Sequence, residues 1–323
     1  MKPSLLVTEL WGLGDLAIAS EFLRRACVHY SVRLIAKPPA IELGRLLWPE
    51  VEVIPFTAPW TRFRGKYQLH RWPWADMARL IGSLRKNPPS VAASARWDPR
   101  DHLLLFLSQA SRRLGFPRTG SRLFLNDPLP PVERDSPRTA QWMALADRLE
   151  LSPRPDPPPD LPPLGDAIVI HSGAAQPVRV WPLERYAGLA NQLREQGWRV
   201  LIICDPSQQA QWELVGETPL CPDSPTRLIE GLLQGRRFIG NDSGPGHIAA
   251  ALGCPTFTLF GPQRPEWFLP DHPQAGWIPG KPCDYKPCFD YCRMPRPHCL
   301  LDQSADEVLA AVLRWLDQWK RGS

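Results

Sequence analysis

The chain has 323 residues, 43% of them hydrophobic and 22% charged, with a formal net charge of +5. This composition is typical of a soluble globular protein and excludes a disordered or collagen-like chain. No apolar run is long enough to span a bilayer. Lys and Arg outnumber Asp and Glu in residues 1–163 but not in residues 164–323. A basic first half favours an anionic partner.

Short apolar runs alternate with runs of helical spacing in the first half. They predict strands at residues 4–8, 31–36 and 51–56, and helices at residues 15–28 and 138–150. Alternation of this kind is typical of α/β domains with parallel sheets.

Seven prolines fall between positions 153 and 163. Proline blocks the hydrogen bonding of helices and sheets, so this segment predicts a stiff, extended linker. We therefore expect an N-terminal domain at residues 1–152 and a C-terminal domain at residues 164–323.

The second half repeats the alternation. Strands are predicted at residues 167–171, 199–204, 237–240 and 255–260, and helices at residues 183–195, 225–234, 244–252 and 304–320. Ser304 is the expected N-cap of the last helix. Two Rossmann-like α/β domains joined by one linker predict a central cleft between the carboxyl ends of two sheets.

The stretch GNDSGPGHIAA, residues 240–250, joins a predicted strand to a helix. Asp242 or Ser243 can cap this helix, and its N-terminus from Gly244 is attractive to anions. His247 lies in the first turn. The alternative is that Asp242 is only a cap and His247 a half-buried structural side chain.

A second loop, HSGAAQPVRVWP, follows the strand at residues 167–171. Its small-residue turn, with Ser172 and Gly173, offers backbone donors to a phosphate. Arg179 adds a bidentate fork. Arg179 is alternatively a solvated surface cation.

The third loop, ELWGLGDLAIA, begins at Glu9 and contains Gly12 and Gly14. The glycines match G-x-G-x-x-A, but they stand too far from the strand for a dinucleotide fingerprint, and no acid ends the second strand. Asp15 would begin the following helix, either as a general base or as an ordinary capping residue.

Together the three loops resemble the heptosyltransferase family, glycosyltransferase family 9. The resemblance rests on LLVTELWGLGDLAIASEFLRRA, HSGAAQPVRVWPLERYAGLANQL and DSGPGHIAA, with LFGP following at residues 259–262. It implies the GT-B fold and an inverting, metal-independent enzyme. Such an enzyme moves a sugar, heptose from ADP-heptose in this family, to a lipopolysaccharide-core or related glycan acceptor.

The resemblance also implies roles for single residues. Asp15 falls on the catalytic base, Arg179 on a phosphate-binding lysine, and Asp242 and His247 on donor contacts. Glu9 stands where the family has a basic residue, which is a departure from its pattern. The full predicted set is Asp15 as catalyst, Ser172, Gly173, Arg179, Asp242, Ser243, Gly244 and His247 for the donor, and Glu9, Gly12 and Gly14 on the acceptor side.

An alternative function is a nucleotide-sugar-binding GT-B protein with epimerase-like or lost activity. The acceptor is expected on the N-terminal domain, where residues 60–87 combine seven Lys and Arg with five Trp, Phe and Tyr. This segment is either an acceptor or anionic-lipid surface, or a solvated face. We expect a cytoplasmic protein, with peripheral contact to the inner membrane face and no nucleic-acid partner.

Residues 283–299 form a cysteine-rich segment with Cys283, Cys288, Cys292 and Cys299. The spacing is not that of a standard zinc site, where C-x2-C pairs are usual. The four cysteines are candidates for a structural zinc site or for unligated thiols. No cofactor is expected to be needed for catalysis.

Overall fold

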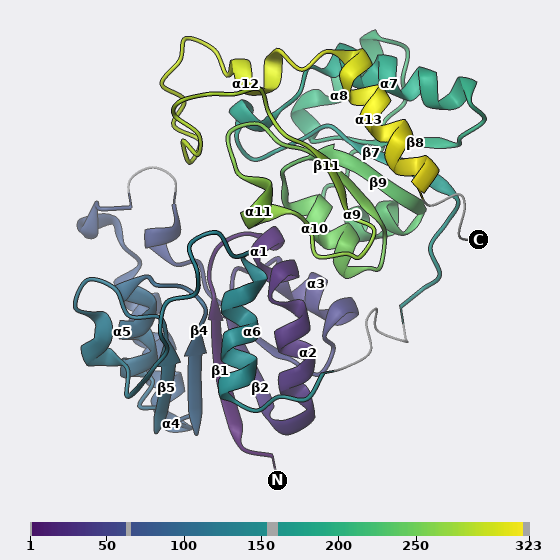
Figure 1. The fold of residues 1–323 in the computed structure, drawn as a ribbon. Helices are drawn as coiled ribbons and strands as arrows, with labels where there is room; N and C mark the ends of the chain where they lie inside the picture. Colours follow the sequence, from purple (N-terminus) through teal and green to yellow (C-terminus); the bar gives the residue numbers. More distant parts are fainter. Residues whose placement is uncertain (1, 63–65, 154–160, 319–323) are drawn as a thin grey trace. The chain divides into compact units, whose positions relative to one another are not determined.

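The computed structural model describes residues 2–62, 66–153 and 161–318. The chain divides into two compact units, Met1–Pro155 (unit 1) and Asp156–Ser323 (unit 2) (Figure 1). Residues 154–160 of the predicted linker lie outside the described residues. The predicted domain limits and the predicted cleft stay predictions.

Unit 1 is built on a six-stranded parallel sheet of order β3-β2-β1-β4-β5-β6. This is the doubly wound order of dinucleotide-binding folds, in which the chain reverses direction across the sheet between β1 and β4. The strands are β1 (Ser4–Glu9), β2 (Ser31–Ala36), β3 (Glu52–Pro55), β4 (Val91–Ser94), β5 (Arg112–Gly115) and β6 (Asp127–Pro128).

Helices cover both faces of this sheet (Figure 1). One core packs β1 and β2 against α4 and α5 through Leu6, Ile35, Leu80 and Leu105. The helices are α1 (Leu13–Ile18), α2 (Ser20–His29), α3 (Ala40–Leu47), α4 (Trp74–Lys86), α5 (Pro99–Leu107) and α6 (Thr139–Arg148).

Unit 2 has a five-stranded parallel sheet of order β11-β10-β9-β7-β8. In chain order this is the 2-1-3-4-5 arrangement of flavodoxin-like sheets, whose reversal lies between β7 and β9. The strands are β7 (Ala167–His171), β8 (Val200–Ile203), β9 (Gly235–Asn241), β10 (Thr256–Leu259) and β11 (Gly276–Ile278).

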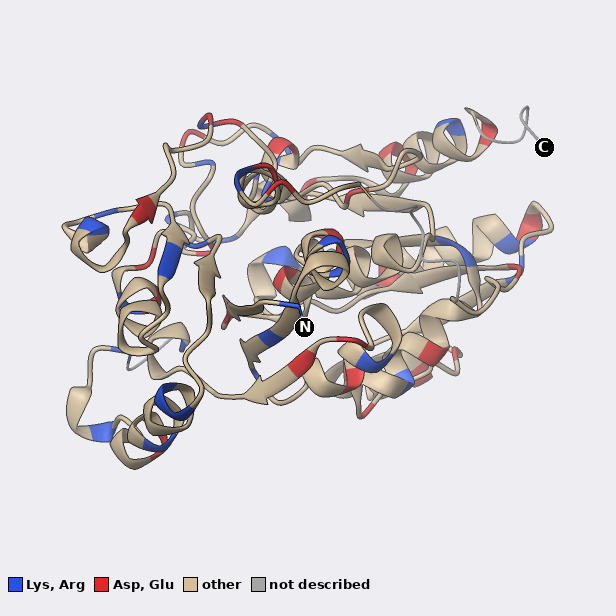
Figure 2. Ribbon diagram, turned by 90° about the horizontal axis from the view of Figure 1, so that it is seen from below, with Lys and Arg blue, Asp and Glu red and all other residues tan. Residues whose placement is uncertain are grey.

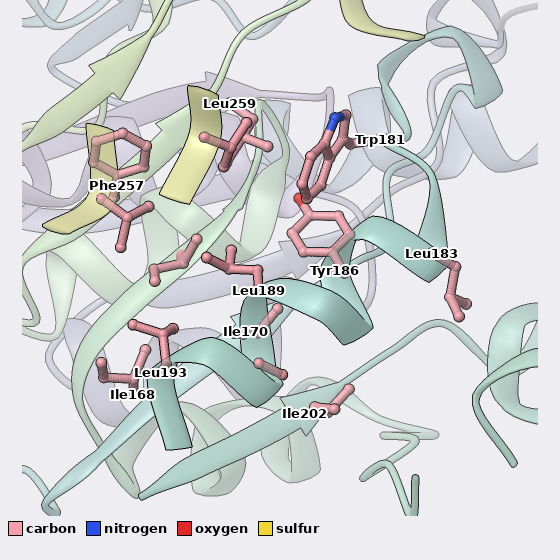
Figure 3. Close-up of a cluster of buried hydrophobic side chains, with 14 of the residues drawn as sticks. Ile168, Ile170, Trp181, Leu183, Tyr186, Leu189, Leu193, Ile202, Phe257 and Leu259 are labelled. Atoms are coloured by element: carbon pink, nitrogen blue, oxygen red, sulfur yellow. The ribbon is translucent and has the colours of Figure 1, made fainter. Parts of the chain in front are cut away.

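The core of unit 2 lies between its sheet and helices α7 and α13 (Figure 3). Trp181 and Tyr186 meet edge to face there, with ring centroids 4.9 Å apart. The helices are α7 (Leu183–Glu195), α8 (Gln209–Leu214), α9 (Pro225–Leu233), α10 (Gly244–Ala251), α11 (Pro265–Phe268), α12 (His298–Leu301) and α13 (Ala305–Gln318).

The predicted strands and helices are confirmed, with one difference. The helix predicted at residues 15–28 is two helices, α1 and α2, separated at Ala19. The hydroxyl of Ser20 donates to the carbonyl of Leu16 at 3.2 Å and accepts from the indole N–H of Trp48 at 3.1 Å. Such a bond from a serine to the carbonyl four residues earlier bends a helix.

The cap predicted for the last helix is confirmed. The Ser304 hydroxyl accepts from the Glu307 N–H at 3.2 Å, and the Glu307 carboxylate accepts from the Ser304 N–H at 2.9 Å. This reciprocal pair is a capping box.

Among the described residues, no helix is long and apolar enough to cross a membrane. Figure 2 shows basic and acidic residues interspersed along the ribbon. Within the predicted basic segment, Tyr67, Leu69 and Trp74 are exposed. Its contact with an acceptor or a membrane stays a prediction.

Asn241 links the ends of the central strands of unit 2. Its side-chain oxygen accepts from the backbone N–H of Trp181 at 3.1 Å and from the Tyr186 hydroxyl at 2.9 Å. Its amide donates to the Ser172 carbonyl at 2.8 Å. Asn241 is 1% exposed, so water cannot replace these bonds.

We predict that Asn241→Ala lowers the free energy of unfolding by about 3 kcal/mol, because it removes the partner of the buried Trp181 backbone N–H and Tyr186 hydroxyl. Urea unfolding followed by tryptophan fluorescence measures the loss. Asn191→Ala, at an exposed site in α7, is the matched control and should change stability by less than about 0.5 kcal/mol. Equal effects of the two substitutions would contradict the role of Asn241.

Candidate functional site

The first candidate loop leaves the carboxyl end of β1, beside β4, where the order of unit 1 reverses. Asp15 lies in the first turn of α1, and its carboxylate accepts from the Gly12 N–H at 3.1 Å. Gly12 is the N-cap, so Asp15 closes the first turn from inside the helix. The Asp15 side chain remains 29% exposed. A carboxylate that is fixed yet accessible suits a general base.

Arg96, directly beyond β4, binds Asp15. Its Nη2 donates to Asp15 Oδ1, and its Nε lies 3.4 Å from Glu9 Oε2. Its guanidinium also lies over the Trp11 ring, 5.2 Å from the centroid. The Arg96 side chain is 12% exposed and that of Glu9 is 1% exposed. The arrangement is a guanidinium held between two carboxylates.

The charges in this cluster shift one another. Burial raises the pKa of Glu9, and the nearby Asp15 raises it further, against the opposing effect of Arg96. Burial alone would lower the pKa of Arg96, but Asp15 and Glu9 hold it above its ordinary value. The Arg96 guanidinium therefore stays charged, and its positive charge offsets the repulsion between the Glu9 and Asp15 carboxylates.

A pocket adjoins Asp15 and is lined by residues from β1, β4 and α6, among them Glu9, Arg96, Arg138 and Gln141. Burial and the neighbouring Arg96 lower the pKa of Arg138 to about 10. The pocket thus holds two guanidinium groups, Arg96 and Arg138, and two carboxylates, Glu9 and Asp15, so that its formal charges balance.

The loops HSGAAQPVRVWP and GNDSGPGHIAA leave the carboxyl ends of β7 and β9, where the order of unit 2 reverses. They meet through Arg179, at the end of a short 3-10 turn, Pro177–Arg179. Arg179 Nη1 donates to Asp242 Oδ2 at 3.1 Å and to the Asp242 carbonyl at 3.3 Å. Arg179 is thus positioned beside the first turn of α10 rather than in bulk solvent.

Ser243 is at the N-cap position of α10, but its hydroxyl makes no capping bond. That hydroxyl is buried and has no hydrogen-bond partner among the described residues. Gly244 begins the helix, and His247 is 9% exposed in its first turn. The buried Ser243 hydroxyl, the N-terminus of α10 and Arg179 together offer hydrogen-bond donors that can bind an anion.

Ser172 and Gly173 have structural partners. The Ser172 hydroxyl donates to Gln208 at 2.9 Å and accepts from the Trp212 indole at 3.0 Å, and Ser172 is fully buried. A Cβ on Gly173 would lie 2.2 Å from Asp205 Oδ2, so a larger residue there would displace the Asp205 side chain. Contact of Ser172 and Gly173 with a donor stays a prediction.

The four clustered cysteines line one pocket, together with Val178, Lys286 and His298. Burial raises the pKa of Cys299 to about 11 and also raises that of Cys288. Within residues 2–62, 66–153 and 161–318, no group of three or more His, Cys, Asp or Glu is arranged to hold a metal ion. The structural-zinc hypothesis therefore has no support in the geometry.

A family model describes part of the chain. Residues 139–296 match "Glycosyltransferase family 9 (heptosyltransferase)". The predicted resemblance to this family is confirmed. The match includes Arg179, Asp242 and Ser243, whereas Asp15 lies outside it. Lipopolysaccharide heptosyltransferase 3 of Escherichia coli K12 is 31% identical over 107 residues, which are 29% of this chain and 30% of that relative.

Solved heptosyltransferases share the fold over nearly the whole chain. E. coli ADP-heptose lps heptosyltransferase II has a TM-score of 0.70 at 20% identity, covering 98% of this chain and 99% of its own. E. coli heptosyltransferase WaaC, solved with ADP-2-deoxy-2-fluoro heptose, has a TM-score of 0.73 at 17% identity, covering 96% and 99%. The predicted GT-B fold of two Rossmann-like domains is confirmed.

Sequence reasoning missed Arg96, Arg138 and Asp290, and Asp290 is a second carboxylate partner of Arg179 besides Asp242. Arg96 could have been found from the strand order. Once β4 is placed beside β1, the residues just beyond β4 must lie near the loop after β1. Asp290 lies 111 residues from Arg179 in the sequence, with no local pattern linking them.

Asp101, in the first turn of α5, is a buried neighbour of the cluster formed by Glu9, Arg96 and Asp15. Its Oδ1 accepts from the Trp60 indole at 2.9 Å, while Oδ2 is buried with no partner among the described residues. Burial, with a smaller effect of Asp98, raises its pKa from 3.8 to about 7. The folded protein therefore keeps this proton at a pH where the unfolded chain has lost it.

Between pH 4 and pH 7, Asp101 consequently makes stability fall as pH rises, by about 1.4 kcal/mol per pH unit at most. We predict that Asp101→Asn, which retains an acceptor for Trp60, gains stability relative to wild type across this window, and that the gain is constant above pH 8. Urea unfolding at pH 5, 6, 7 and 8 measures the difference. A difference independent of pH would show that Asp101 is already ionised in the fold.

Proposed function

We propose that the protein is an inverting glycosyltransferase that moves a sugar from a nucleotide-diphospho-sugar, with ADP-heptose as the favoured donor, to a lipopolysaccharide-core or related glycan acceptor. The observation that carries this proposal is where two charged residues lie in the two sheets. A held, accessible carboxylate stands at the reversal point of one sheet, and an arginine beside a helix N-terminus stands at that of the other.

The donor diphosphate is assigned to unit 2. Arg179, the Ser243 hydroxyl, which has no partner in the part of the chain that the structure describes, and the N-terminal N–H groups of α10 would contact it, with Asp242 fixing the arginine. Negative charge builds on the leaving phosphate oxygen as the glycosidic bond breaks, so fixed positive groups at that oxygen stabilise the transition state. These groups supply the positive charge that a metal ion supplies in other enzymes, and the proposal assigns no metal ion.

The acceptor is assigned to unit 1. Asp15 would take the proton of an acceptor hydroxyl while that oxygen forms a bond to the anomeric carbon and the nucleoside diphosphate leaves. One displacement inverts the anomeric configuration. Arg138, which lines the pocket beside Asp15, would donate to a polar group of the acceptor.

Arg96 is a positioning residue in this scheme, because it fixes Asp15 and favours its ionised form. We predict that Arg96→Gln lowers kcat by about 100-fold and moves the acidic limb of the pH–rate profile upward. Arg96→Lys should restore part of both. The control is Arg100→Gln, which removes a local pair with Asp98. Loss of rate without a change in the pH profile would indicate a purely structural role.

The alternative function, a nucleotide-sugar-binding protein with epimerase-like or lost activity, predicts donor binding without transfer. Thermal-shift screening of a panel of sugar nucleotides identifies the donor. Release of nucleoside diphosphate with and without glycan acceptors then separates transfer from binding. Peripheral contact through residues 60–87 predicts binding to anionic vesicles that weakens as salt is raised.

We predict that Asp15→Asn lowers transfer by about 1,000-fold or more while the Kd of the nucleotide stays within about threefold, because the base acts only on the acceptor. Arg179→Gln, in contrast, should raise the Kd of the nucleotide, because it removes a group that binds the donor. Isothermal titration with ADP and a coupled assay of released ADP measure the two effects. Loss of nucleotide binding in Asp15→Asn would sink the assignment of the base.

A further inference from the structure

The cysteine-rich segment, residues 283–299, folds back onto Arg179. Asp290 accepts from Arg179 Nε at 2.7 Å and from Nη2 at 2.8 Å, a bidentate pair along one edge of the guanidinium. The Arg179 side chain is 21% exposed and that of Asp290 is 12% exposed. The pair is therefore shielded from solvent, and it joins two segments that are remote in the sequence.

The backbone of the segment is strained at this contact. Phe289 and Asp290 have φ values of 50° and 70°. Residues other than glycine rarely adopt this left-handed region, and each such residue costs free energy that surrounding contacts must offset. Phe289 stacks on Trp267 with ring centroids 6.0 Å apart, although it remains 59% exposed. The ion pair with Arg179 is thus a main contact holding this turn in place.

The pair uses the groups of Arg179 that a phosphate needs. Bidentate recognition of phosphate or carboxylate takes two parallel N–H groups of a guanidinium. Nε and Nη2 donate to Asp290, and Nη1 donates to Asp242. A diphosphate cannot take the Nε and Nη2 edge while the Asp290 carboxylate occupies it.

We propose that Asp290 is a latch: its carboxylate occupies the phosphate-gripping edge of Arg179, and an incoming nucleoside diphosphate displaces it and releases residues 283–299. This inference rests on the proposed function, because it assumes that Arg179 binds a diphosphate. Binding is then an exchange of one anion for another, and the latched state reduces the affinity for nucleotide by the fraction of molecules it occupies.

The test compares wild type, Asp290→Asn and Asp284→Asn by isothermal titration with ADP, and in parallel with GDP and UDP. Asp290→Asn keeps the shape but removes the charge, and should tighten the Kd of the nucleotide about tenfold. Asp284 is an exposed acid of the same segment, so its substitution is the matched control and should leave the Kd unchanged.

Trypsin cleavage gives a second readout that needs no variant. Arg293 is exposed in the segment and precedes Met294, and ADP should speed cleavage after Arg293 in the wild type. Weaker nucleotide binding by Asp290→Asn, or cleavage that ADP does not change, overturns the latch alone. If neither wild type nor Asp290→Asn binds any of the three nucleotides, the proposed function fails and the latch with it.

Discussion

The carboxyl ends of parallel strands meet at one edge of a sheet, and neighbouring connections diverge to opposite faces at only one point along it. This constraint places the candidate residues of both units. In unit 1 the point lies between β1 and β4, which brings Asp15 and Arg96 together from positions 81 residues apart. In unit 2 it lies between β7 and β9, which brings Arg179 to Asp242. The loops after β1 and β9 are short, so the sheets position Asp15 and Asp242 directly, whereas Arg179 lies on a longer loop after β7.

A buried acid at position 9 requires a cation nearby, because an isolated carboxylate in the interior would be protonated or would destabilise the fold. Arg96 is that cation, and it serves Asp15 as well. Glu9 departs from the pattern of the resembling family at a position where a basic residue is usual. The positive charge is not lost from the neighbourhood of Asp15, because β4 supplies it instead of β1.

The elements that were predicted have local signals: apolar spacing, prolines and small-residue turns set three strands of unit 1 and four of unit 2 to within a few residues. The strands β4, β5, β6 and β11 were not predicted. The three loops were also predictable, since a parallel α/β chain must place them at strand ends. What local sequence did not encode was long-range pairing. The break at Ala19 depends on Trp48, and the partner of Arg179 comes from position 290. Hydrogen bonds between distant segments leave no periodic trace.

The two units contain the same arrangement, an arginine between two carboxylates, but assign the active part differently. In unit 1 the carboxylate of Glu9 is the most enclosed member, and the carboxylate of Asp15 is the most accessible one. In unit 2 the carboxylate of Asp242 is the most enclosed member, and Arg179 is the accessible one. Burial therefore decides which charge a ligand meets: an acid ready to accept a proton in the first unit, and a cation ready to exchange its anion in the second.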